Sequence, residues 1–543
     1  MQPETHNLDR RQFLQITTTA AASLLLGATA CQLTPEPAAA DGAPVEATAT
    51  PLAETATTCD SAQIDEPLPT LRVALSVLPT TFDPALFENI EVYPFGFAIF
   101  DGLVWVDAQL TPQPMLAERW ETNRDGHQWI FHLRTDVTFH HGSPFTAADV
   151  EYTVTRLLDR KLGSPLEPVL RFVQKVEAVD DHTVRFHLAT PNVDLPLLLA
   201  APQLRILPHD YAMDRMMRHP SGTGPFRFDE HRSGELIRYV RNPDYWAADR
   251  IAIAALEHIY IPALDDQVAA LVCGKLDLLL EIGPDQIAQL QGNPDIVVRQ
   301  TPSGRYQNLA MRVKGHPFDD KRVRQALKAC LDRSELHQQV LQGQGAVGND
   351  HPIAPINRFF PDLTMPPPNL ERARQLLTEA GHPNGLQLQL LTADAFPGMV
   401  QLADAVQEMA KPAGIEIEVI EAKVPSEIYF TDYWGVVPFY VSAWEFRPSL
   451  YETFAIAYHS TSYWNETGWS SPALDQLLDA AQQERSPEQR RVLYREAAQL
   501  LMDEGPVMIP YFQPVLVAMR NRVQGFTPHP AGWIDLRDVQ LSG

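Results

Sequence analysis

The chain has 543 residues, with 43 Lys and Arg against 68 Asp and Glu, so its formal net charge is −25 with histidine neutral. This acidity argues against nucleic-acid binding, which depends on clustered Lys and Arg. The hydrophobic fraction of 45% and the charged fraction of 20% are ordinary for a globular protein, and the length allows two or three cores.

The first 30 residues have the pattern of an export signal. Arg10 and Arg11 precede an apolar run over 13–30 that is too short and too weakly apolar for a membrane span. The arginine pair resembles a twin-arginine motif, and the small residues that end at Cys31 resemble a bacterial lipobox. We therefore predict a signal peptide over 1–30 and lipidation of Cys31.

Residues 31–67 form a second atypical segment. They include seven acids, five prolines and nine alanines, with no Lys or Arg. Such a stretch buries little apolar surface and is extended by its own charge. We predict a disordered stalk, and the remaining 476 residues then carry a charge of −25 + 7 = −18.

From about residue 68, strand-like and helix-like patterns alternate, which predicts α/β layers and more than one domain. The predicted strands cover 71–77, 129–133, 257–261, 277–282, 386–391, 415–420 and 437–441. The predicted helices cover 146–159, 265–273, 321–331, 370–380, 398–411 and 487–502. Cys273 and Cys330 fall within two of these helices, where a buried free thiol is the usual state.

Motifs of exported hydrolases and metal sites are missing from the sequence. It has no GxSxG, HExxH, phosphate-binding GKS/GKT or EF-hand pattern. Residues 343–348 match GxGxxG, but they follow a predicted helix rather than a strand, so we interpret them as a loop. His140 and His141 are adjacent at a strand end and would point to opposite faces, which favours a turn over a metal site. These patterns nominate no catalytic residue, metal site or cofactor.

Aromatic side chains concentrate near the C-terminal third. Fourteen of the 41 residues from Tyr429 to Trp469 are aromatic, about 34% against 9% for the whole chain. Together with a few polar groups, such density fits the lining of a cleft for an organic ligand.

Spaced blocks along the chain resemble family 5 of the bacterial extracellular solute-binding proteins, the dipeptide, oligopeptide and nickel receptors of ABC importers. The blocks include LTPQPMLAERW at 110–120, VTFHHG at 137–142, GTGPF at 222–226, NPDYW at 242–246 and PFDD at 317–320. The similarity runs from about residue 71 to 526.

The resemblance implies a two-lobed clamshell of α/β class, with an extra α+β domain inserted in the first lobe. We expect lobe I at 68–100, 222–303 and 505–543, the inserted domain at 101–221, and lobe II at 304–504. Ligand would bind between the lobes, and closure would be sensed by a membrane permease.

The sequence leaves the class of ligand open. In peptide-binding members an Asp in a segment that follows a Trp holds the ligand amino terminus, whereas the corresponding segment here places Arg447 after Trp444 and Glu445. Arg447 would favour a carboxylate or phosphate unless Glu445 supplies the negative charge. The candidate ligand-binding residues are Phe95, Tyr306, Trp444, Glu445, Arg447, Trp464, Asn465 and Trp469.

The sequence thus predicts a monomeric, lipid-anchored receptor at the periplasm or the outer face of the cell membrane. It would capture a peptide or another small organic molecule and deliver it to an ABC permease. A nickel or metal-chelate receptor, a ligand-binding sensor for a chemoreceptor and an exported hydrolase remain alternatives.

Overall fold

The computed structural model describes residues 69–88, 90–462 and 464–542. The predicted signal peptide, the stalk and the predicted lipidation site Cys31 lie outside the described residues. Every described residue belongs to one compact unit, Asp60–Gly543.

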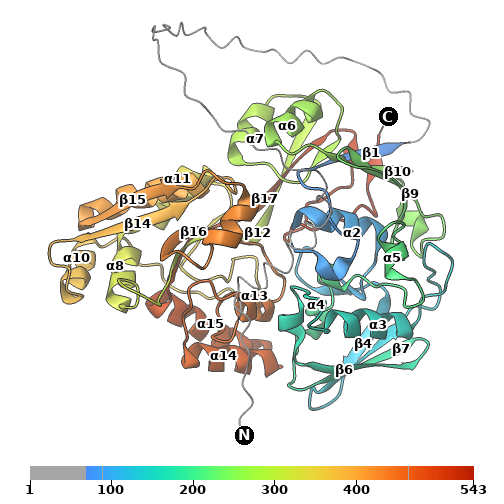
Figure 1. The fold of residues 1–543 in the computed structure, drawn as a ribbon, viewed down its shortest axis with the longest axis horizontal. Helices are drawn as coiled ribbons and strands as arrows, with labels where there is room; N and C mark the ends of the chain where they lie inside the picture. The colour runs from blue at the N-terminus through green and yellow to red at the C-terminus, as the bar shows by residue number, and fades with distance from the viewer. Residues whose placement is uncertain (1–68, 89, 463, 543) are drawn as a thin grey trace, which may run out of the picture. The chain divides into compact units, whose positions relative to one another are not determined.

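One large mixed sheet runs through the described chain (Figure 1). Its strands are β1 (Thr70–Leu75), β8 (Phe226–Arg232), β9 (Leu236–Arg241), β10 (Ala255–Tyr260), β11 (Leu278–Leu279), β12 (Ile296–Met311), β13 (Ala346–Val347), β14 (Leu386–Thr392), β15 (Ile415–Glu421), β16 (Phe439–Trp444) and β17 (Val507–Arg520). The strand order is β15-β14-β16-β12-β17-β11-β1-β10-β9-β8, and β13 pairs with β17. The strands β11, β1, β10, β9 and β8 belong to lobe I, and the strands β16, β14 and β15 belong to lobe II.

The long antiparallel strands β12 and β17 belong to both lobes. The first half of β12 pairs with the end of β17, which also pairs with β11 of lobe I. The second half of β12 pairs with the start of β17 and with β16 of lobe II. The β12–β17 register shifts twice, and Pro510 and Pro514 of β17 lie at these irregularities. Because proline has no N–H to donate, a bulge is where a paired strand accommodates it.

Lobe I and the inserted domain share one hydrophobic core, which extends from Leu71 to Val539. A separate four-stranded sheet, in the order β4-β5-β7-β6, lies within the predicted inserted domain. Its strands are β4 (Ala117–Thr122), β5 (Gln128–Leu133), β6 (Val173–Asp180) and β7 (Thr183–Leu188). Two short strands, β2 (Val104–Val106) and β3 (Pro112–Pro114), form a hairpin, and β18 (Val523–Gln524) pairs with β19 (Gln540–Leu541).

The helices of this half are short. The α-helices are α2 (Tyr93–Ile99), α3 (Ala147–Leu157), α4 (Leu195–Leu198), α5 (Met213–Met216), α6 (Leu264–Val272) and α7 (Pro284–Leu290). The 3₁₀ turns are η1 (Pro84–Leu86), η2 (Ile90–Val92), η3 (Glu167–Leu170), η4 (Pro202–Leu204) and η5 (Ala248–Arg250). In α3 the Asp149 carboxylate accepts the backbone N–H of Thr146, at 2.8 Å, which fixes the helix start.

Besides a small cluster of Ala310, Trp434 and Tyr440, lobe II contains two large core clusters, which its helices cover. Its helices are α8 (Lys321–Cys330), α9 (Arg333–Leu341), α10 (Leu370–Glu379), α11 (Met399–Ala410), η6 (Lys411–Ala413), α12 (Ser426–Ile428), the π-helix η7 (Tyr429–Tyr433), α13 (Leu450–Ala457), α14 (Pro472–Gln483) and α15 (Pro487–Glu504). One cluster joins α8 to α11 with the lobe II strands, and the other joins α13 to α15 with β17.

The two-lobed α/β class predicted from the sequence is confirmed, while the exact domain boundaries stay a prediction. Cys330 is a buried free thiol as expected. The expectation of a free thiol at Cys273 is wrong, because Cys273 is disulfide-bonded. No helix in the described part of the chain combines the length and the apolar character that a membrane crossing requires.

Candidate functional site

Arg305 lies where β12 passes from lobe I to lobe II, directly after a shift in its register with β17. Its Nη2 donates to Glu281 Oε1 of lobe I at 2.8 Å, and its Nε lies 3.0 Å from Glu445 Oε2 of lobe II. The antiparallel pairing of Tyr306 with Trp444 brings the adjacent Arg305 and Glu445 opposite each other. One guanidinium group therefore joins carboxylates from both lobes.

Arg305 is more deeply buried than its two carboxylate partners. The Arg305 side chain is 10% exposed, whereas Glu445 is 32% and Glu281 43% exposed. Burial lowers the pKa of Arg305, but the carboxylates of Glu281 and Glu445 outweigh it and hold the pKa above its ordinary value. Burial raises the pKa of Glu445, and Arg305 opposes the change. The Arg305–Glu445 pair is thus only partly hydrated.

The carboxyl group of Glu91 in η2 also interacts electrostatically with this arginine. Burial raises the pKa of Glu91 to about 7, a backbone hydrogen bond lowers it, the charges of Glu445 and Glu281 raise it further, and Arg305 lowers it. Two carboxyl groups therefore contact the Arg305 guanidinium at the junction of the lobes, and a third interacts with it electrostatically.

Arg447 already has partners within lobe II. Its Nη1 donates to the Glu445 carbonyl at 3.0 Å, its Nε lies 3.4 Å from Glu452 Oε1, and its guanidinium lies 5.8 Å from the centre of the Trp444 ring. Burial raises the pKa of Glu452, and Arg447 opposes this shift. Tyr93 of lobe I has a pKa raised to about 12 by burial and lowered in part by the charge of Arg447. Arg447 therefore acts electrostatically on both lobes.

The predicted aromatic wall is partly assembled in lobe II. Trp434 lies between Trp444 and Trp464, with ring-centre distances of 5.9 and 5.5 Å. Trp464 is 37% exposed. Asn465 shapes the adjoining loop, because its Nδ2 donates to the Trp469 carbonyl at 2.7 Å. Trp469 is partly buried against the core cluster of α13 to α15.

Two of the predicted ligand-binding residues lie in cores. Phe95 is fully buried in lobe I, where its ring stacks on Phe82 at 4.7 Å. Tyr306 is buried beneath the lobe junction, and its hydroxyl forms a 2.8 Å hydrogen bond with Tyr458. Neither side chain has an open surface in this structure. The other predicted residues lie together in lobe II, and all eight ligand assignments stay predictions.

The sequence interpretation missed the residues that complete the charged site. These are Glu91, Glu281, Arg305, Glu452 and Glu466. A usable signal existed for Glu281, because this residue lies within the predicted strand at 277–282. Charged side chains at strand ends often line a ligand crevice.

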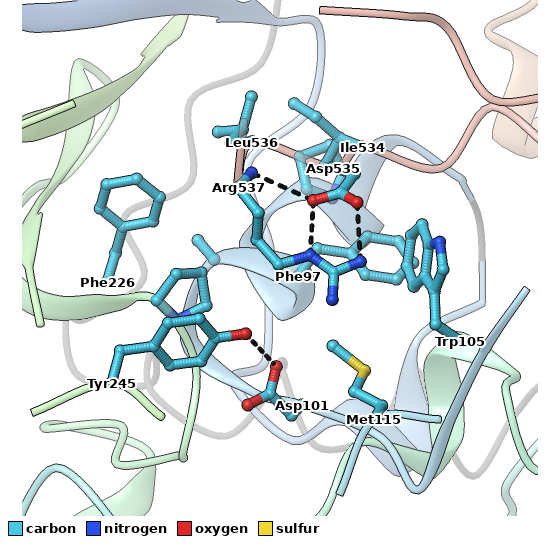
Figure 2. A pocket seen from close by; sticks show the side chains of 13 residues that line it. Phe97, Asp101, Trp105, Met115, Phe226, Tyr245, Ile534, Asp535, Leu536 and Arg537 are labelled. Atoms are coloured by element: carbon cyan, nitrogen blue, oxygen red, sulfur yellow. Dashed lines mark hydrogen bonds and ion pairs between the residues drawn. The ribbon is translucent and has the colours of Figure 1, made fainter. Parts of the chain in front are cut away.

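A separate small cavity lies within lobe I, against the inserted domain (Figure 2). Its volume is about 20 Å³, which is room for about one water molecule. Buried Asp101 accepts a hydrogen bond from Tyr245 at 3.2 Å, and Arg537 pairs with Asp535 at 2.7 Å (Figure 2). Trp246 also donates to Asp101, at 3.0 Å. Burial raises the pKa of Asp101. The size of this cavity excludes it as a site for an organic ligand.

Metal coordination receives no support from the described side chains. Within the described ranges, no three His, Cys, Asp or Glu residues form a group that could hold a metal ion.

Residues 111–466 match the family described as "Bacterial extracellular solute-binding proteins, family 5 Middle". The chain is 27% identical over 531 residues to di/tripeptide-binding protein 2 of Pseudomonas aeruginosa, covering 89% of this chain and 96% of the relative. It is 26% identical over 511 residues to heme-binding protein A of Haemophilus influenzae, covering 86% and 91%. Its fold is similar to the crystal structure of a dipeptide-binding protein from Pseudoalteromonas sp. SM9913 in complex with Met-Leu, with a TM-score of 0.77, 23% identity, and coverage of 87% of this chain and 100% of the other.

Proposed function

Because this chain belongs to family 5 of the bacterial extracellular solute-binding proteins, we propose that it is the ligand-capturing component of an ABC importer. Its lobes close around a peptide or another small organic molecule, and the closed form delivers this ligand to the permease. No ligand bond is broken and no resident cofactor is needed. The protein is exported, anchored through a lipid on Cys31, and monomeric.

The observation that carries this proposal is the position of Arg305. Arg305 lies where β12 passes from one lobe to the other, and it contacts Glu281 of lobe I and Glu445 of lobe II. A movement of one lobe against the other must change these contacts, so ligand binding here is coupled to closure.

The charge balance supports a ligand with a positively charged group. The ionisable side chains at the junction are four carboxyl groups and two guanidinium groups, from Glu91, Glu281, Glu445, Glu452, Arg305 and Arg447. Closure removes these groups from water. A cation of the ligand then stabilises the carboxylates that the two guanidinium groups do not neutralise. The free amino terminus of a peptide is such a cation, and Trp444 beside Arg447 offers apolar contact area.

A thermal-shift screen of the purified protein, followed by native mass spectrometry, tests this function. The probes are Met-Leu, N-acetyl-Met-Leu as the matched control without an ammonium group, haemin, a nickel–histidine chelate and a set of organic acids. We expect Met-Leu to raise the melting temperature and the acetylated peptide to have no effect. A ligand at 100 times its Kd adds about 2.7 kcal/mol of stability.

The same screen distinguishes the alternatives. Stabilisation by haemin or the nickel chelate, with none by either peptide, would replace the peptide class by that ligand. Stabilisation by no probe, together with a ligand-free mass spectrum, would contradict solute capture. Neighbouring permease and ATPase genes support import, whereas a lone chemoreceptor gene supports sensing.

A further inference from the structure

One buried carboxylate connects the tryptophans of lobe II. Glu466 is 4% exposed and accepts four hydrogen bonds from side chains. Its Oε1 accepts from Asn308 Nδ2 at 3.0 Å and from Trp444 Nε1 at 2.9 Å. Its Oε2 accepts from Trp434 Nε1 at 2.7 Å and from the Tyr440 hydroxyl at 3.3 Å. Because a carboxylate has about four acceptor positions, the capacity of Glu466 is filled.

The indoles bound to Glu466 belong to a row that extends to the surface. The Trp444 end of the row lies beside Arg447, and at the other end Trp434 contacts the exposed Trp464. An indole has a single polar group, so a hydrogen bond to Nε1 fixes the orientation of the whole ring. The carboxylate thereby sets the orientation of two rings directly and of Trp464 through packing.

The position of Trp434 is consistent with such a role. It directly follows the π-helix η7, and π-helical turns are frequent at functional sites. A buried ionised group is costly unless hydrogen bonds satisfy it, and the four donors come from β12, β16 and the end of η7. Apolar packing alone would hold these rings without a buried charge, but with less control over their orientation.

We propose that Glu466 is a positioning residue for the ligand wall, which holds the Trp434 and Trp444 indoles in the binding orientation before the ligand arrives. This inference rests on the proposed function, because it assumes that the row of indoles faces the ligand. Preformed aromatic surface increases affinity because no ordering cost is left for the binding step.

The variant E466Q tests the proposal. Its amide keeps one acceptor oxygen and replaces the other by an NH₂ donor, so one indole N–H must face another donor. We expect the ¹H–¹⁵N indole signal of Trp434 or Trp444, assigned with W434F and W444F, to shift, and acrylamide to quench tryptophan fluorescence more strongly. Met-Leu should bind about tenfold more weakly, the loss expected when a buried donor is left unpaired.

The matched control is D350N. Asp350 is another buried acid of lobe II, and its carboxylate is bound to Arg333 and to the Ile509 N–H rather than to an indole. D350N should lower the melting temperature but leave the indole signals and Met-Leu affinity unchanged. An E466Q variant that behaves like D350N would overturn the proposal. If the unmodified protein binds no peptide, the proposed function fails instead, and the indole signals and acrylamide quenching still decide whether Glu466 orients the rings.

Discussion

Among the described residues, two ionic contacts join lobe II to the rest of the protein, and they differ in how fully their charges are paired. Asp194 of the inserted domain pairs with Arg490 of α15 at 2.6 Å, and both side chains are 4% exposed. The Ser449 hydroxyl also donates to Asp194, and Arg490 donates to the Ala481 carbonyl. Arg305, in contrast, contacts two partly exposed carboxyl groups and interacts electrostatically with a third, that of Glu91.

The difference indicates separate roles for the two contacts. The Asp194–Arg490 pair is balanced one to one and needs no additional charge. The Arg305 site has surplus negative charge, which a bound cation or a proton would balance. We infer that the first contact holds the two domains together, whereas the second leaves a place for the charge of the ligand.

Breaking the balanced pair should have the largest effect on stability. R490M leaves Asp194 buried without its charge partner, and removal of one member of a buried ion pair costs about 3 to 5 kcal/mol. Urea denaturation should show this loss as a lower midpoint of unfolding.

An exposed pair provides the matched comparison. Asp214 and Arg218 lie 3.0 Å apart in the inserted domain, and their side chains are 71% and 66% exposed. D214N should change the urea midpoint little, because surface ion pairs contribute roughly 0 to 1 kcal/mol. Equal effects of R490M and D214N would contradict the distinction between a buried and a solvated contact.

Changing the unbalanced site should affect ligand binding more than folding. E445Q removes one carboxylate but leaves Arg305 paired with Glu281. We expect Met-Leu affinity to fall about tenfold, equivalent to about 1.4 kcal/mol, while the urea midpoint changes by less than it does in R490M. Isothermal titration calorimetry measures the first effect. Unchanged affinity with a large loss of stability would assign Glu445 a structural role.

The regular elements were largely predictable, because their signals are local. The helices at 321–331 and 370–380 were found within one residue, since Asp320 and Asn369 accept hydrogen bonds from the first turns. The strands β12 and β17 were missed. Pro302 and Gly304 interrupt the pattern of the first, and Pro510 and Pro514 that of the second, so neither has a local pattern that predicts a long strand. The strands β4 and β6 to β9 were not predicted either.

Of the candidate site, only the residues at and just after the end of β16 were predictable from the sequence. Trp444, Glu445 and Arg447 are close in sequence, so composition indicated them together. Glu91, Glu281 and Arg305 come from three distant segments, and pairing across β12 and its neighbours brings Arg305 to the two acids. Local sequence patterns carry no information on such pairings.

The surplus charge should also appear as a smaller, pH-dependent effect on stability. The pKa of Glu91 is raised from 4.5 to about 7 by burial, with Glu445 and Glu281 adding to the shift and Arg305 opposing it. The folded protein therefore keeps a proton that the unfolded chain releases, so this contribution to stability is complete below pH 4.5 and is lost as the pH rises through 7.

The variant E91Q removes this titration. The wild type should lose about 1 kcal/mol more than E91Q between pH 5 and 8, allowing for solvent screening. Urea denaturation at both pH values measures the difference, in which groups common to both proteins, such as the buried histidines, cancel. A parallel loss in the two proteins would show that Glu91 is ionised throughout and that the carboxylates around Arg305 are already balanced.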